Sequence, residues 1–159
     1  MRRHFVPDPV LRYSTDFPAV RRTPSFFHTL YDAEGNRAAR YVWTDLDSDE
    51  QVDEGERTAI TEYAWDNRNR LVRVTERPAD GAALTKAVDY LYDTHNRWIA
   101  RLADLDGAGE DPAETTRFVY DEDQIVLQLG ASGAISNRYL WGPVVDQLLA
   151  DEQLPDSAI

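Results

Sequence analysis

Hydrophobic and polar positions alternate in short runs, and most of these runs open on two aromatic residues two positions apart. The clearest run is Tyr90-Leu91-Tyr92, followed by polar residues and then by an apolar stretch at 98–102. The same order recurs at 63–75 and, less completely, at 118–126, 31–43 and 139–142. Side chains at i and i+2 share one face of a strand but diverge around a helix. The pattern therefore predicts strands.

Each aromatic pair leads into a polar segment that is typical of a tight turn. An aspartate follows the aromatics, and the steps between these aspartates are 34, 27 and 28 residues: Asp32, Asp66, Asp93 and Asp121. A carboxylate there can accept a backbone N–H two residues on, and Gly and Asn tolerate a positive φ: Gly35, Asn69 and Asn96. A period of this length indicates one supersecondary unit per repeat. We interpret each unit as a β-hairpin and the aspartate as a turn former, not a catalytic acid.

The fold class predicted is all-β, with tandem hairpins forming a curved antiparallel sheet. A single hairpin is marginal in water, so the hairpins must lie side by side and bury a shared aromatic face. We expect an extended or disordered arm at 1–26, about four repeats within 27–152, and a tail at 153–159. Residues 78–81 are expected to form a turn, and 144–153 fits a helix or a strand.

Composition and charge exclude several classes of partner and site. The 159 residues are 42% hydrophobic and carry a net charge of -12, with the acidic residues concentrated after residue 30. Such an acidic body argues against nucleic-acid and anionic-membrane partners. There is no cysteine, which excludes disulfides and thiolate sites, and no apolar run is long enough to span a membrane. The start, with Pro7 and Pro9 where an apolar region would be needed, carries no export signal.

An acidic insertion at 45–56 has the spacing of a calcium-binding loop. Counting from its first aspartate, carboxylates fall at positions 1, 3, 5, 9 and 12, as in an EF-hand loop. Position 6, normally glycine, is Glu50, so a positive φ there would cost about 1 kcal/mol or more. The alternative is an ordinary solvated acidic loop. The candidate calcium ligands are Asp45, Asp47, Asp49, Gln51 through its backbone carbonyl, Asp53 and Glu56.

Other chemistry finds little support in the sequence. A second insertion at 104–114 resembles an eroded version of the first, with Ala108 at the third ligand position. The three histidines are isolated, and there is no nucleophile elbow or phosphate-binding glycine loop. We therefore expect no enzymatic activity.

The repeated aromatic-x-Tyr/Trp-Asp-x-x-Gly/Asn-Arg unit resembles the YD repeat of Rhs-type proteins. That group includes bacterial wall-associated proteins, toxin-encapsulating shells and the animal teneurins. The resemblance covers roughly residues 27–152, and 138–147 is similar to the end of bacterial arrays. It implies a secreted or cell-surface protein in which hairpins spiral into a hollow β-shell. This chain departs from the pattern because it has only about four units and no toxin domain.

Three functional hypotheses follow. The first is a non-catalytic structural module, stiffened by calcium, whose unpaired edges join the rest of a longer array or a second copy. The second is a carbohydrate-binding module that stacks glycans on exposed aromatics: Trp43, Trp65, Trp98 and Trp141. The third is a remnant of a toxin-encapsulating shell.

Overall fold

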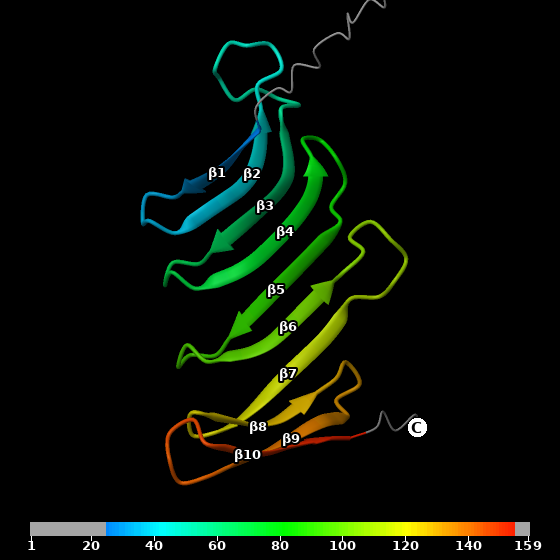
Figure 1. Ribbon diagram of the computed structural model, residues 1–159. Coiled ribbons are helices and arrows are strands. Elements are labelled where there is room, and N and C mark those ends of the chain that lie inside the picture. Colours follow the sequence, from blue (N-terminus) through cyan, green and yellow to red (C-terminus); the bar gives the residue numbers. More distant parts are fainter. Residues whose placement is uncertain (1–24, 155–159) are drawn as a thin grey trace, which may run out of the picture.

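The computed structural model describes residues 25–154, which form ten strands and no helix (Figure 1). The fold is all-β, as the alternation predicts. The strands are β1 Ser25–Tyr31, β2 Arg37–Thr44, β3 Arg57–Trp65, β4 Leu71–Ala79, β5 Lys86–Tyr92, β6 Trp98–Asp104, β7 Glu114–Asp121, β8 Gln124–Leu129, β9 Ile135–Trp141 and β10 Leu148–Gln153.

The strands form one antiparallel sheet in which spatial order equals chain order, from β1 to β10. Five hairpins therefore lie side by side, and β1 and β10 are the two edges. The turns inside the hairpins all lie along one end of the sheet, and the connections between hairpins lie along the other (Figure 1). The sheet is curved (Figure 1). It is also open, because no pairing joins β10 to β1.

Every hairpin carries the same irregularity beside its turn. The register shifts just before the second aromatic of each motif, as between Ala64 and Trp65 or between Leu91 and Tyr92. One extra residue is accommodated at the start of each returning strand: Ala38, Val72, Ile99, Val126 and Leu149. Such a bulge increases local twist and re-aims the neighbouring side chain. Here the aromatic that precedes the turn pairs with the residue next to the bulge, as Trp65 does with Leu71 and Tyr92 with Trp98.

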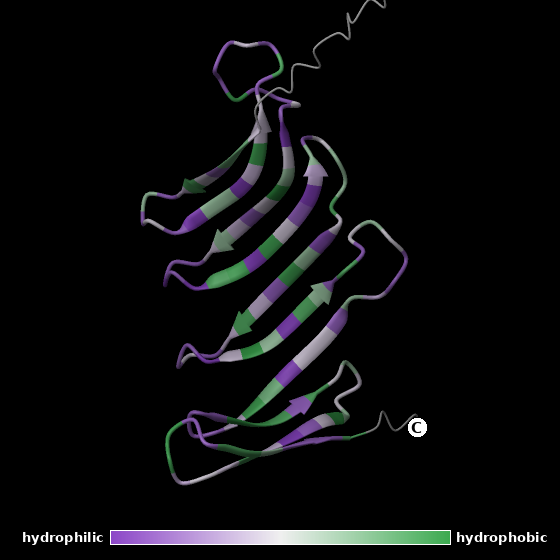
Figure 2. Ribbon diagram, in the orientation of Figure 1, coloured by the Kyte–Doolittle hydropathy of each residue, from purple (hydrophilic) through white to green (hydrophobic). Residues whose placement is uncertain are grey.

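The sheet is a single layer with a thin core. In the described residues, six hydrophobic side chains are buried: Tyr41, Ile60, Ala87, Val88, Ala100 and Ala103. None of the largest side chains is fully buried. Green apolar and purple polar positions alternate along the strands (Figure 2). With no second layer over either face in residues 25–154, lateral contacts between hairpins must supply much of the stability.

Some predicted boundaries shift. Strand β4 continues through Pro78 and Ala79, so the turn predicted at 78–81 begins only at Asp80. Of the two alternatives for 144–153, the strand holds at 148–153. Strand β1 begins two residues before the predicted start of the array, and the rest of the predicted arm, 1–24, lies outside the described residues. No helix capable of crossing a bilayer is found in residues 25–154.

Candidate functional site

The repeated aspartate closes each of the first three turns. The carboxylate of Asp93 accepts the backbone N–H groups of His95 at 2.8 Å and Arg97 at 2.9 Å. Asp66 and Asp32 make the equivalent pair of bonds to residues two and four positions on. The left-handed position expected in each turn is also found, with φ of 86° at Gly35, 57° at Asn69 and 66° at Asn96. The prediction that the repeated aspartates form turns is confirmed for these three. Asp121 instead is the last residue of β7 and pairs with Gln124, so the fourth turn is shorter, with a φ of 52° at Glu122.

In the second and third turns, an arginine four residues after the aspartate links the turn to the next hairpin. Arg70 binds Asp66 through Nε at 2.7 Å, and its guanidinium lies 4.8 Å from the centre of the Tyr92 ring. Arg97 repeats this with Asp93 at 2.8 Å and with the Tyr120 ring at 4.9 Å. The Arg70 side chain, with its bonds to the carboxylate, lowers the pKa of Asp66 to about 2. The same residues thus fix the turn and join neighbouring repeats.

The aromatic that precedes each of the last four turns makes the reciprocal bond to the hairpin before it. Its polar atom donates to the backbone carbonyl at the start of the preceding returning strand. The four bonds are Trp65 Nε1 to Arg37 O at 2.8 Å, Tyr92 Oη to Leu71 O at 3.0 Å, Tyr120 Oη to Trp98 O at 2.8 Å and Trp141 Nε1 to Ile125 O at 2.7 Å. We call this set the aromatic ladder. It joins all five hairpins.

Sequence variants of the motif keep its physical role. In the first repeat Asn36 stands at the arginine position, and its Nδ2 binds Asp32 Oδ2 at 3.1 Å. The adjacent Arg37 then lies over the Tyr63 ring at 5.8 Å. Asn36 also donates to Asn69 Oδ1 at 3.1 Å, which ties the first turn to the second. The degenerate copy is therefore linked to its neighbour by the same types of contact.

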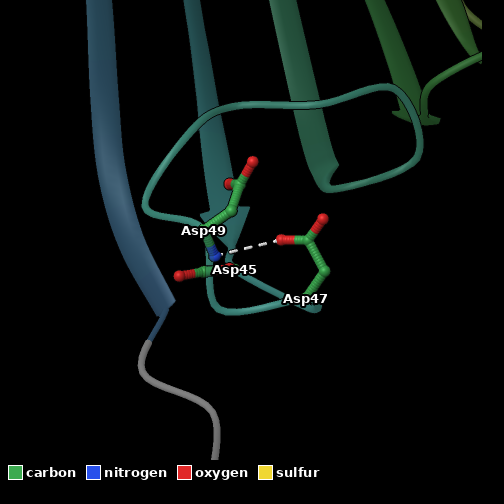
Figure 3. A group of neighbouring side chains, drawn as sticks. All are labelled: Asp45, Asp47 and Asp49. Carbon is green, nitrogen blue, oxygen red and sulfur yellow. Dashed lines mark hydrogen bonds between the residues drawn. The ribbon is translucent and has the colours of Figure 1, made fainter.

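The acidic loop at 45–56 brings together three of its predicted ligands. One oxygen from each of Asp45, Asp47 and Asp49 lies within 4.8 Å of the others, and the three side chains are neighbours in the loop (Figure 3). Each carboxylate also accepts a backbone N–H from within the loop, as Asp47 does from Asp49 at 3.2 Å. Glu50 has a φ of 61°, so the residue at the glycine position does adopt the strained conformation.

The predicted closing ligand, Glu56, has a different role. It is buried, and its carboxylate accepts bonds from Trp43 Nε1 at 2.8 Å and from the backbone N–H groups of Leu46 at 2.7 Å and Asp53 at 3.2 Å. These bonds, the one from Trp43 foremost, lower the pKa of Glu56. Glu56 thus holds the loop from inside and lies outside the cluster of three aspartates.

Of the two remaining candidates, Asp53 is outside that cluster, and its backbone N–H is bound by Glu56. The side-chain amide of Gln51 donates to Asp49 Oδ2 at 3.1 Å, and its backbone carbonyl stays a predicted ligand. Three carboxylates are fewer than the six to eight oxygens that Ca²⁺ takes, so water would have to complete the shell. Calcium binding at this loop stays a prediction.

A carboxylate that sequence reasoning missed anchors the same loop from the neighbouring connection. Asp80, at the end of β4, pairs with Arg57 at 2.7 Å and accepts the Gly55 backbone N–H at 3.1 Å. Burial opposes its ionisation, but the bonds from Arg57 and Gly55 outweigh that and lower its pKa. No local spacing pattern marks Asp80, because its partners lie more than 20 residues earlier.

Repulsion remains in the exposed part of the loop. The pKa of Asp47 is raised: the bond from the Asp49 N–H favours ionisation, yet desolvation and the nearby carboxylates of Asp49 and Glu56 outweigh it. Ionised Asp47 is therefore less favourable in the folded loop than in an unfolded chain. A cation bound among the three aspartates would relieve this repulsion.

The second acidic insertion forms a loop of another kind. Asp104 accepts the N–H of Gly107 at 2.7 Å, and Ala108 donates to the Leu84 carbonyl at 3.2 Å. Gly107 has a φ of 63°, and a Cβ built there would lie 2.0 Å from Leu84 O. Among the described residues, the carboxylates that cluster at metal-ligand distances belong to the first loop. The second loop packs against the β4–β5 connection.

The tryptophans are less exposed than the glycan-stacking hypothesis expects. All four are half-buried, and carbohydrate binding stays a prediction. Each indole N–H also donates within the sheet: Trp43 to Glu56, Trp65 to Arg37 O, Trp98 to Ala100 O and Trp141 to Ile125 O. The aromatic ladder directs the rings of Trp65 and Trp141 toward the preceding hairpin.

The chain matches no protein-family model and no curated protein.

Proposed function

We propose that this protein is a non-catalytic structural module, a section of wall in a larger β-structure of the YD-repeat kind. The observation that carries the proposal is the aromatic ladder, with its Asp–Arg clamps, which repeats the same contacts at successive junctions. The residues that define the motif are used to join one hairpin to the next. Because the motif resembles the YD repeat of Rhs-type proteins, we also propose that the protein is secreted or located at the cell surface.

The small size of the buried core supports this role. The sheet is one layer thick and open at both edges, and its buried side chains are few within residues 25–154. In a repeat array of this kind each unit contacts its neighbours alone, so stability grows with the number of junctions. Such a design suits extension and does not require a pocket. It fits a section of wall better than a closed container, because the sheet does not close on itself.

The proposal predicts that the sheet accepts another unit. We would insert a second copy of residues 86–113 directly after residue 113, so that the new Tyr92 faces Trp98 O and the new Asp93–Arg97 clamp faces Tyr120. We expect a higher urea midpoint and a larger denaturant slope, because one more junction and more buried surface are added.

A matched insertion isolates the motif. The same segment with serine at its own Asp93, Arg97 and Tyr92 positions has equal length but lacks the clamp and the ladder bond. It should give no rise in midpoint. If the native-sequence insertion also fails to raise the midpoint, or is cleaved out by protease as an unfolded loop, the structural-module proposal is wrong.

A further inference from the structure

The outer strands repeat, without a partner, the two sides of the internal junctions. Each junction pairs the returning strand of one hairpin with the leading strand of the next, antiparallel, as in β4 with β5 and β6 with β7. In the described part of the chain, β1 is a leading strand with nothing before it, and β10 is a returning strand with nothing after it. The molecule therefore ends in two different and complementary halves of one interface.

The leading edge exposes an aromatic that the other hairpins half-bury. Tyr31 precedes the first turn, at the position of Trp65 and Tyr92 in the ladder, and is 61% exposed. Phe27, four residues earlier in β1, is 85% exposed. At each internal junction this position reaches the preceding hairpin, and residues 25–154 provide none for Tyr31. Its exposure is that of an unused ladder donor.

The returning edge exposes the matching acceptor position. Leu148 is the first residue of β10, as Leu71 is of β4, and the carbonyl of Leu71 accepts the ladder bond from Tyr92. All six residues of β10 are exposed, including Leu148 at 48% and Leu149 at 56%. An open apolar edge strand invites pairing with another strand.

The charges of the two edge strands favour unlike pairing. Strand β1 carries no arginine, lysine or carboxylate, and β2 behind it carries Arg37 and Arg40. Strand β10 carries Asp151 and Glu152, and Glu152 lies 3.7 Å from Arg138 of β9. Two returning edges brought together would place carboxylates near carboxylates, whereas a leading edge brings none to the contact.

We propose that the chain associates head to tail with a second copy of itself, β1 of one molecule pairing antiparallel with β10 of the other. Tyr31 then donates to the carbonyl of Leu148 of the second copy, as a further step of the aromatic ladder. This inference rests on the proposed structural function and names its partner. Because the two surfaces differ, the contact is heterologous and grows into a ring or an open chain.

Two single-edge variants of the full chain test the pairing. Phe27→Lys blocks the leading edge, and Leu149→Lys blocks the returning edge, since lysine on an edge strand discourages further pairing. Both positions are exposed, so the fold is expected to survive, which circular dichroism checks. The matched controls are Leu46→Lys and Val145→Lys, which place the same charge at exposed apolar residues outside the strands.

Sedimentation velocity in about 0.15 M salt, where the charge of -12 is screened beyond roughly 8 Å, gives the readout. The wild-type chain and both controls should increase in mass with concentration to at least that of a dimer. Each edge variant alone should stay monomeric. An equimolar mixture of the two should form a dimer and nothing larger, because one intact leading edge and one intact returning edge remain.

The other outcomes overturn the inference. A wild-type chain that is monomeric throughout, or an edge variant that still dimerises alone, contradicts head-to-tail pairing. Those results leave the repeat-insertion test untouched, so failure of self-association is distinguishable from failure of the structural role. Monomeric wild-type chains that are nevertheless stabilised by the inserted hairpin would assign the open edges to other partners.

Discussion

At the scale of single residues, Asp47 is the carboxylate most affected by charge repulsion in the acidic loop. Its carboxylate lies among those of Asp45 and Asp49 and its pKa is raised, so its charge opposes folding at neutral pH. Asp47→Asn should therefore raise the thermal midpoint in EDTA by about 1–2 °C, the scale of relieved surface repulsion. Circular dichroism melts measure it.

Calcium should reverse the order of the two proteins. If the three aspartates bind the ion, millimolar calcium raises the midpoint of the wild-type chain by mass action and raises that of Asp47→Asn much less. Glu56→Gln is the informative comparison, because Glu56 holds the loop without joining the cluster. It should lower the midpoint with or without calcium. Identical wild-type melts in both buffers would make the loop a solvated connection.

Two glycines with similar backbone angles separate strain from close packing. Gly81 and Gly107 have φ of 68° and 63°, but a Cβ at Gly81 meets nothing within 4 Å whereas one at Gly107 would overlap the Leu84 carbonyl. Gly81→Ala should cost about 1 kcal/mol, from the left-handed conformation alone. Gly107→Ala should cost about 2–4 kcal/mol, because backbone must also move. Urea titrations compare them, and equal losses would contradict the packing of the loop on the β4–β5 connection.

At the scale of the hairpin, Arg97 is both clamp and link. It binds the Asp93 carboxylate, donates to the Glu122 carbonyl and lies over the Tyr120 ring. Arg97→Lys keeps the charge but loses the planar fork, so we expect a loss of about 1–2 kcal/mol in unfolding free energy. Arg73→Lys is the control, because Arg73 makes an exposed ion pair with Asp89 at 3.3 Å. Similar losses of unfolding free energy in both variants would contradict a stabilising role for the Asp93–Arg97 clamp.

The hairpin is also the scale at which sequence reasoning succeeds and then stops. Aromatics at i and i+2 and positive-φ residue types are local signals, and they locate the turns at 32–36, 66–70 and 93–97 correctly. The bulge at Val72 or Ile99 leaves no local mark, because it depends on register with the opposite strand. The role of Glu56 also depends on a residue distant in sequence. The spacing predicts a calcium ligand, whereas in the structure Glu56 accepts a hydrogen bond from Trp43.

At the scale of the whole molecule, the sheet depends on carboxylates that stay ionised. The pKa values of Asp66, Asp93, Asp80 and Glu56 are lowered in the folded chain, that of Asp66 to about 2 from an ordinary value of 3.8. For an acid with a lowered pKa, the stabilisation is present above the unfolded value and disappears as pH falls through the folded one. The clamps should therefore weaken between about pH 4 and pH 2.

Acidification also removes repulsion from a chain of net charge -12, which acts in the opposite direction, so the wild-type curve alone does not isolate the clamps. The difference between wild type and Asp66→Asn does. At pH 7 the variant should have the lower urea midpoint, because Arg70 and two backbone N–H groups lose a charged acceptor. As pH falls from 4 to 2 the two midpoints should converge, since protonation removes the same charge from the wild-type chain. A constant difference over that range would mean that Asp66 acts through shape alone and that the Asp–Arg clamp is not electrostatic.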